Sequence, residues 1–108
     1  TTSSYTCLKE FTILQKLNEK YKQRLQIVTI CVDNDKNDIT NLLKNTGYDW
    51  TFLHYGNKPE IVKDFDIRAY PTYFLIGPDK KLLLSPAPSP EEDFEIKFFK
   101  ILRSRGEI

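Results

Sequence analysis

The stretch Leu25-Gln26-Ile27-Val28-Thr29-Ile30-Cys31-Val32-Asp33 constrains the fold more than any other part of this chain. It is rich in β-branched residues, which favour strands, and it is apolar on both faces around Val28 to Val32. A strand of that kind is typical of a sheet interior that helices cover on both sides. We therefore expect an α/β protein with residues 25–33 as an interior strand. Cys31 falls inside this strand and is expected to be a small buried hydrophobe.

Two predicted helices flank this strand in the sequence. Residues 7–22 carry apolar side chains at spacings of three and four, which predicts a helix with one buried face and with Thr6 as its N-cap. A second helix is expected from Asn37 or Asp38 to about Thr46, with Gly47 ending it.

The second half of the chain alternates short elements in the same way. We expect an extended segment over 48–54, a short helix over 59–65, a strand over 71–76 and its antiparallel return over 81–84. Residues 85–88 look like a stiff connector, and Ser89-Pro90-Glu91-Glu92 looks like a capping box that opens the last helix. The order of elements predicts an α/β sandwich with a small mixed sheet, in one domain over residues 1–108.

The composition excludes several classes of function. With 108 residues and a net charge of +1, the chain gives no reason to expect nucleic acid or an anionic membrane as a partner. No apolar run reaches membrane-spanning length and no signal peptide is visible. His54 is the only histidine, so we expect neither a metal site nor a cofactor. Because Cys7 opens a helix and Cys31 lies in a strand, we do not expect a bond between them.

Candidate chemistry gathers where Ser4-Tyr5-Thr6-Cys7 runs into the first helix. Unpaired backbone N–H groups and the helix dipole stabilise a thiolate at such a place. Compared with the motif Cys-x-x-Cys, the second cysteine is present and the first is Ser4. Disulfide exchange needs a thiolate to attack and a second thiol to release the mixed disulfide, and a serine hydroxyl replaces neither at neutral pH.

Two segments carry a family resemblance that extends from about Ser4 to Arg105. Residues 7–11 and 65–76 resemble the active-site helix and the proline segment of bacterial thioredoxin-like proteins, in the thiol–disulfide interchange and alkyl-hydroperoxide-reductase/thiol-specific-antioxidant superfamily. The resemblance implies a thioredoxin-like three-layer sandwich, and a cis Pro71 whose loop faces the thiol and whose backbone can pair with an extended substrate. It also implies that Glu10 lies under the thiols and relays protons. It places such domains in the periplasm or cell envelope, often with a membrane tether, which here would lie upstream of Thr1.

The chain departs from that family in several positions. Ser4 replaces the attacking cysteine, Thr12 replaces a proline, and Lys80 occupies a turn position that is often glycine. The family's strand between residues 25–33 and 71–76 is absent from this sequence. We therefore expect a fragment, a cleaved chain, or a strand supplied by another molecule, with 25–33 and 71–76 not paired to each other.

These departures leave three functional hypotheses open. The first is a binding module that has lost dithiol chemistry and takes a peptide or a protein thiol or disulfide beside Pro71, in a groove lined by Tyr5, Thr6, Trp50 and Tyr70. The second is a one-cysteine peroxidase, in which Ser4 lies three residues before Cys7 and Arg68 lowers the pKa of the thiol. The third is a single reactive Cys7 that forms mixed disulfides with partners.

Overall fold

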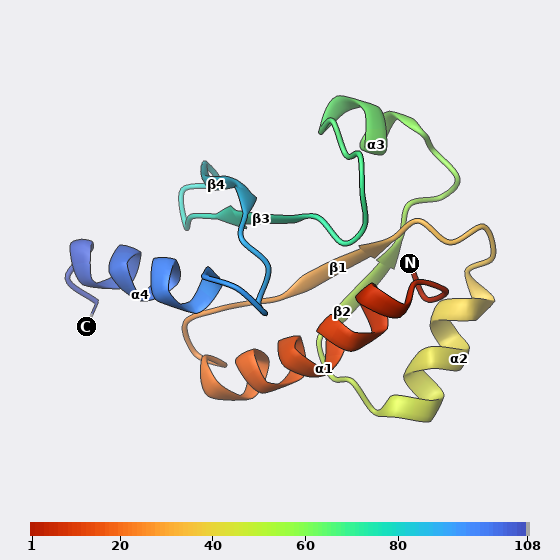
Figure 1. The fold of residues 1–108 in the computed structure, drawn as a ribbon, viewed down its shortest axis with the longest axis horizontal. Helices are drawn as coiled ribbons and strands as arrows, with labels where there is room; N and C mark the ends of the chain where they lie inside the picture. The colour runs from red at the N-terminus through yellow and green to blue at the C-terminus, as the bar shows by residue number, and fades with distance from the viewer. Residues whose placement is uncertain (108) are drawn as a thin grey trace. The chain divides into compact units, whose positions relative to one another are not determined.

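The computed structural model describes residues 1–107 and gives an α/β fold (Figure 1). Its elements follow in the order α1 (Tyr5–Lys20), β1 (Val28–Cys31), α2 (Asn37–Thr46), β2 (Thr51–His54), α3 (Glu60–Asp64), β3 (Tyr73–Ile76), β4 (Leu82–Ala87) and α4 (Phe94–Ser104). The contacts divide the chain into two compact units, one over Thr1–Pro71 and one from Thr72 onward.

The first unit is built on a two-stranded parallel ladder. β1 pairs with β2 so that Thr29 lies opposite Phe52 and Cys31 opposite His54. Parallel neighbours need a crossover connection, and α2 lies in that connection. Within residues 1–107, β1 pairs with β2 inside the first unit, and β3 pairs with β4 inside the second.

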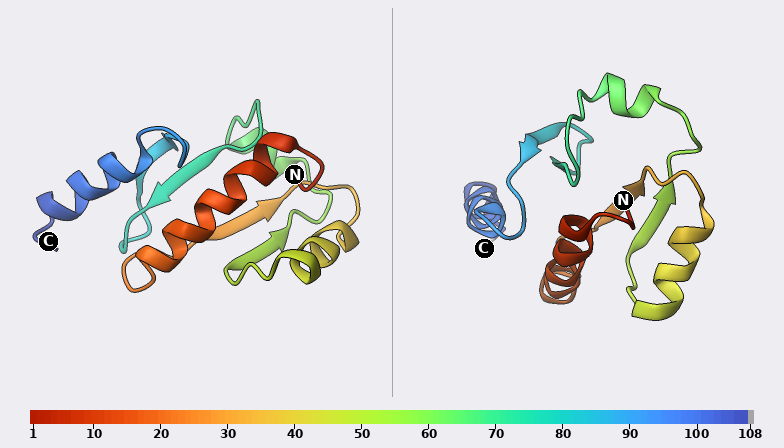
Figure 2. Two further views of the ribbon diagram at one scale, coloured as in Figure 1. Left: turned by 60° about the horizontal axis from the view of Figure 1, so that its bottom comes forward. Right: turned by 45° about the vertical axis from the view of Figure 1, so that its right-hand side comes forward.

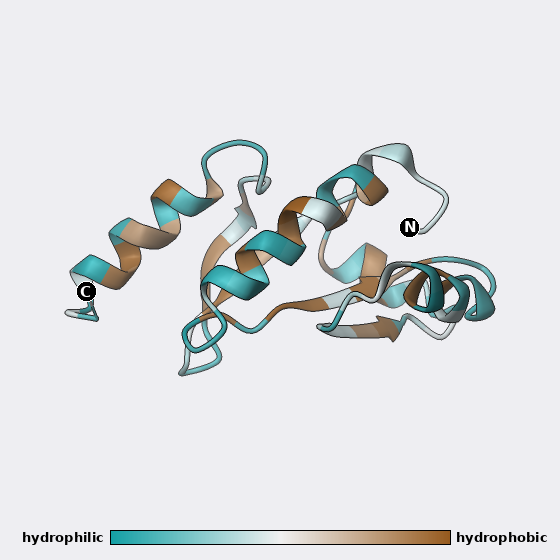
Figure 3. Cartoon of the chain, turned by 90° about the horizontal axis from the view of Figure 1, so that it is seen from below, coloured by the Kyte–Doolittle hydropathy of each residue, from teal (hydrophilic) through white to brown (hydrophobic). Residues whose placement is uncertain are grey.

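An aromatic cluster holds α1 against this ladder. The ring of Phe11 meets Tyr48, Trp50 and Phe52 edge-on, with centroids 6.1, 6.3 and 5.5 Å away. The indole Nε1 of Trp50 also donates to Thr29 Oγ1 at 2.9 Å. Figure 3 shows hydrophobic residues recurring along α1 between polar ones, as a one-sided helix requires. The core of the first unit is this contact between helix and sheet.

The contacts also fix the direction of α1. Near its C-terminal end, Asn18 Nδ2 donates to Asp49 Oδ1 at 2.8 Å, just before β2 begins. Phe11, two turns earlier in the helix, meets Phe52, three residues further along the chain from Asp49. The helix therefore runs antiparallel to both strands, as the two views of Figure 2 show. The N-terminus of α1 consequently lies at the carboxyl ends of β1 and β2.

The interior-strand prediction for residues 25–33 is only partly met. Cys31 is buried at 1% exposure, as expected, but Val28 and Ile30 are 49% and 48% exposed. Side chains alternate across a strand, so Thr29 and Cys31 take the face toward α1 while Val28 and Ile30 take the other. Apolar residues on both faces therefore did not mean burial of both faces.

Two predicted helix starts were wrong. The N-cap of α1 is Ser4 rather than Thr6, so the helix begins at Tyr5. The capping box at Ser89 does not form, and α4 begins later, at Phe94. Ser89 Oγ instead accepts from the backbone N–H of Glu91 at 3.1 Å, a local turn that competes with helix initiation. By contrast, α2 ends at Thr46, with Gly47 at φ +69° as predicted.

The second unit joins an antiparallel hairpin to α4. Its turn closes through Lys80 N–H donating to Gly77 C=O at 2.9 Å, and Lys80 itself has φ +67°, a conformation that glycine usually takes. β4 extends to Ala87, so residues expected in the connector at 85–88 belong to a strand. In α4, Phe94 and Phe98 stack at 5.8 Å and are buried.

Candidate functional site

Ser4 has a structural role at the start of α1. Its side-chain oxygen accepts from the backbone N–H of Cys7 at 3.3 Å, and its carbonyl accepts from Leu8 at 3.0 Å. The first bond satisfies one of the N–H groups that the first turn of a helix leaves unpaired, and the second is the first intrahelical bond of α1. The Ser4 hydroxyl thus supplies a good N-cap for the helix that carries Cys7.

Cys7 lies under a short segment that is fastened to the end of β1. The thiol is only 1% exposed, and the backbone nitrogen of Thr1 donates to its Sγ at 3.2 Å. Thr2 is held by Asp33: its backbone N–H lies 3.0 Å from each carboxylate oxygen, and its hydroxyl donates to Oδ2. Asp33 is itself only 6% exposed. A bulky disulfide substrate cannot reach Cys7 without displacing this segment.

Cys31 is the second buried thiol. It ends β1, is 1% exposed, and its carbonyl accepts from the backbone N–H of Tyr55 at 3.0 Å. Burial, and then the negative charge of Asp33, raise the pKa of the Cys31 thiol to about 11. At neutral pH Cys31 is therefore a protonated thiol. Both cysteines are free in this structure.

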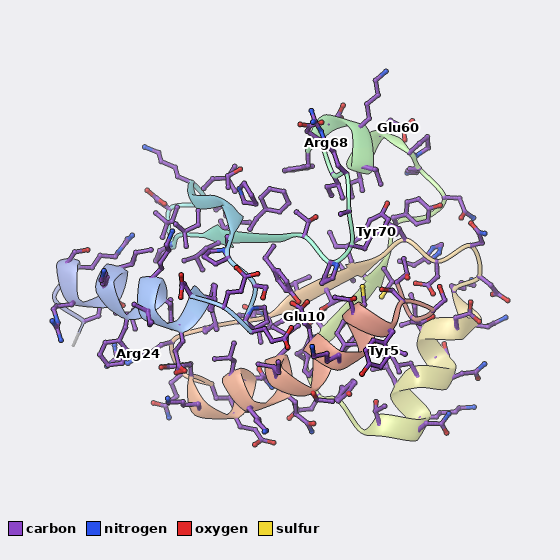
Figure 4. The ribbon with its side chains drawn as sticks, viewed as in Figure 1. Tyr5, Glu10, Arg24, Glu60, Arg68 and Tyr70 are labelled. Atoms are coloured by element: carbon purple, nitrogen blue, oxygen red, sulfur yellow. The ribbon has the colours of Figure 1, made fainter. Side chains whose placement is uncertain are left out.

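Glu10 occupies the buried side of α1. It is 4% exposed and follows Cys7 by three residues, about one helical turn, on α1 (Figure 4). The resemblance predicts that Glu10 relays protons to a thiol, and that role stays a prediction.

An open groove lies on the other side of β1. It has a volume of about 480 Å³ and is lined mostly by apolar side chains: Val32, Tyr55, Pro59, Val62, Lys63, Asp66, Ile67 and Tyr70. α3 and the segment that follows it form one wall, and Tyr70 is 40% exposed at the edge. The Tyr70–Pro71 peptide bond is cis. The groove is thus a surface beside Pro71 that a ligand can reach without any residue moving.

The structure does not bring all of the predicted binding residues to this groove. Tyr5 is 80% exposed at the start of α1, apart from the residues that line the groove, and Thr6 follows it in the exposed first turn (Figure 4). Trp50 is 8% exposed and belongs to the aromatic cluster near the start of β2. Its indole packs because the rings of Phe11 and Phe52 surround it, so of the four predicted groove residues only Tyr70 lines the groove.

Arg68 is engaged by a neighbouring carboxylate. Its guanidinium lies 3.1 Å from Asp66 Oδ2, and its Nε donates to Oδ1 at 3.1 Å. The side chain is 83% exposed. The structure therefore gives the arginine that a peroxidase would need to a surface ion pair, whereas the polar neighbour of Cys7 Sγ is the Thr1 nitrogen.

Sequence reasoning missed Asp33 and Thr2, which together close the thiol end of the first unit. A signal was present, because Asp33 is a carboxylate at the end of an apolar strand and has to find donors when buried. The signal for Thr2 was weaker, since small hydroxyl residues are ordinary in loops. His54 is similarly fixed: Gly56 N–H donates to its Nδ1 at 3.0 Å, and its Nε2 faces the Asp33 carbonyl at 2.5 Å. Within residues 1–107 no three potential metal ligands gather.

Residues 1–82 match a protein-family model described as thioredoxin-like. This chain belongs to that family. The matched stretch contains the Ser4–Cys7 turn, the groove and Pro71. Comparison with curated proteins found no match. None of the helices described in residues 1–107 has the length and apolar character needed to cross a membrane.

Proposed function

We propose that this thioredoxin-like chain is a peptide-binding module that uses the groove beside Tyr70 and Pro71. One observation carries the proposal: an open groove with both apolar and polar lining lies next to Pro71, while Cys7 is enclosed. A volume of about 480 Å³ lies in the range of pockets that hold a ligand. The family's proline segment lies beside the substrate, so the position of the groove fits a retained binding role.

The lining favours an extended segment with an apolar anchor. Val32, Val62 and Ile67 offer apolar contact, and Tyr55 and Tyr70 add rings with a polar end. Lys63 and Asp66 supply one charge of each sign, which favours no strongly charged ligand. A peptide that presents one aliphatic or aromatic side chain, with polar residues around it, meets these requirements.

The same proposal holds that the chain is impaired as a dithiol oxidoreductase. Ser4 cannot attack a disulfide, and its hydroxyl is committed to capping α1. Cys7 is 1% exposed, so it is poorly placed to substitute as the attacking thiol. Insulin disulfide reduction should be near background for the natural chain, and a gain in Ser4→Cys is expected because that change restores Cys-x-x-Cys. Turnover by the natural chain would contradict this part of the proposal.

Binding can be tested with a random peptide library displayed on phage, followed by fluorescence anisotropy with the selected peptide. Tyr70→Ala should weaken binding of that peptide about tenfold or more, because it removes an aromatic wall of the groove. Tyr5→Ala is the matched control, since Tyr5 is 80% exposed outside the groove.

A second matched pair separates the groove from the sheet surface. Val62→Glu puts a charge into the apolar lining, whereas Val28→Glu puts the same charge on the half-exposed outer face of β1. Loss of binding in Val62→Glu alone is the expected result. Equal loss in both variants, or no selected peptide at all, would refute the groove as the binding surface.

A further inference from the structure

The interface between α1 and β1 holds two thiols that the proposed binding role leaves unused. Cys7 and Cys31 are each 1% exposed, and they are the two cysteines of the chain. We propose that Cys7 and Cys31 form a reversible intramolecular disulfide, which makes this helix–sheet contact a redox-sensitive cross-link. This inference is independent of the groove and reverses the expectation drawn from the sequence that the two would not bond.

Cys7 on α1 and Cys31 on β1 lie at nearly the same position along the helix–strand interface. Phe11 meets Phe52 at 5.5 Å, and Phe52 lies opposite Thr29 in the ladder. Cys7 is four residues before Phe11, a step of about 6 Å along a helix. Cys31 is two residues after Thr29, a step of about 6.6 Å along a strand. Because α1 runs antiparallel to β1, the two steps point the same way and have nearly equal length.

Both side chains also face the same interface. Thr29 points toward α1, since its hydroxyl accepts from Trp50 in the aromatic cluster, and Cys31 shares that face two residues on. On the helix, Cys7 and Phe11 are four residues apart and lie on one face. The burial of both sulfurs agrees with this placement.

The N-terminal segment ties the two positions together independently. The Thr1 nitrogen contacts Cys7 Sγ at 3.2 Å, and the next residue, Thr2, bonds Asp33, two residues beyond Cys31. A negative charge on Cys7 contributes to raising the pKa of Cys31, an influence that needs a short separation. Two contacts and one electrostatic influence therefore place the thiols in one small region.

The oxidant we name is a low-molecular-weight disulfide, which reaches Cys7 when the segment of Thr1 and Thr2 that covers the thiol is displaced. The Cys7 thiolate attacks one of its sulfurs, the external S–S bond breaks, and one thiolate leaves. Cys31 then loses its proton and attacks Cys7 Sγ, which forms the internal S–S bond and releases the second external thiol. The protein loses two hydrogens, and the external disulfide gains them. Cys31 acts in the second step because its thiol, with a pKa of about 11, is protonated at neutral pH.

The full chain would be incubated with oxidised glutathione under native conditions, quenched with acid, and its free thiols alkylated after denaturation. We expect monomers with no alkylatable thiol, a mass lower by about 2 Da, and a cross-linked peptide containing Cys7 and Cys31. Dithiothreitol should restore both thiols. Oxidation should accelerate as pH rises, because a larger fraction of Cys31 becomes a thiolate.

Two variants test the order of attack. Cys31→Ala should stop at a single glutathione adduct on Cys7, and Cys7→Ala should keep its remaining thiol free. If a variant does not fold, the proposal is tested by peptide mapping of the unmutated chain alone, through the presence or absence of the cross-linked peptide with Cys7 and Cys31. Accumulated glutathione adducts, disulfide-linked dimers, unreacted thiols, or a Cys7–Cys31 bond that forms only in urea would each overturn the proposal. None of these readouts involves peptide binding. Failure of the disulfide proposal can therefore be distinguished from failure of the proposed binding function of the groove.

Discussion

Cys31 and Val32 are neighbours in the chain, yet they belong to regions of opposite character. Cys31 enters the closed interface under α1, at 1% exposure, and Val32 lines the open groove formed with α3. The alternation of side chains in an extended segment is the cause. The comparison teaches that one step along the chain separates a closed interface from an accessible surface: the Cys31 thiol lies in the closed interface, and Val32 lies on the accessible surface.

The largest expected difference between the two sides is in stability. Phe11→Ala removes the ring at the centre of the closed interface and should lower the free energy of unfolding by about 3 to 5 kcal/mol. Tyr70→Ala, on the open side at 40% exposure, should cost less than about 1 kcal/mol. Urea unfolding of both variants measures the difference in their free energies of unfolding. Similar losses in the two variants would contradict this prediction.

The burial of Cys31 between α1 and β1 should also make the free energy of unfolding depend on pH in the alkaline range. Burial and Asp33 raise the pKa of Cys31 from 9.0 to about 11, so between these values the folded state keeps a proton that the unfolded state has lost. Stability therefore falls as pH rises through this window, by up to about 2 to 3 kcal/mol.

Urea midpoints across that pH range, for the natural chain and for Cys31→Ala, isolate this contribution. The slope due to Cys31 should be missing in the variant, whatever its overall stability. Parallel curves for the two proteins would show that Cys31 is not protected on the closed side.

Removing the charge of Asp33, which holds the N-terminal segment through Thr2, should lower the stability by a smaller amount. Asp33→Asn weakens the bonds from Thr2 and should cost about 1 to 2 kcal/mol. It should also lower the pKa of Cys31, since the Asp33 charge is one cause of its rise. Alkylation of Cys7 should become faster as the segment loosens; an unchanged rate would mean that this segment does not control access.

The smallest expected effect concerns the cap. Ser4→Ala removes the acceptor for the Cys7 N–H and should cost about 1 kcal/mol in thermal or urea unfolding. Ser3→Ala is the control, because the Ser3 hydroxyl contacts the exposed Thr1 side chain rather than the helix. Equal effects would remove the structural reason for serine at position 4.

Local sequence patterns determined much of the fold. The helical stripe of α1, the β-branched strand, the Gly47 stop and Pro59 at the start of α3 predicted their elements because each acts over only a few residues. The start of α4 was missed for a related reason. Ser89 offered the right cap residue, and a competing turn took its hydroxyl.

The sites depended on distant parts of the chain. The sequence by itself determined the thioredoxin-like resemblance and the position of Cys7 at a helix start. The tertiary structure decided that Trp50 packs, that Arg68 pairs with Asp66, and that both thiols are buried at one interface. These outcomes depend on contacts between residues that are far apart in the sequence. A short-range sequence pattern cannot predict such contacts, including the packing of α1 against β1.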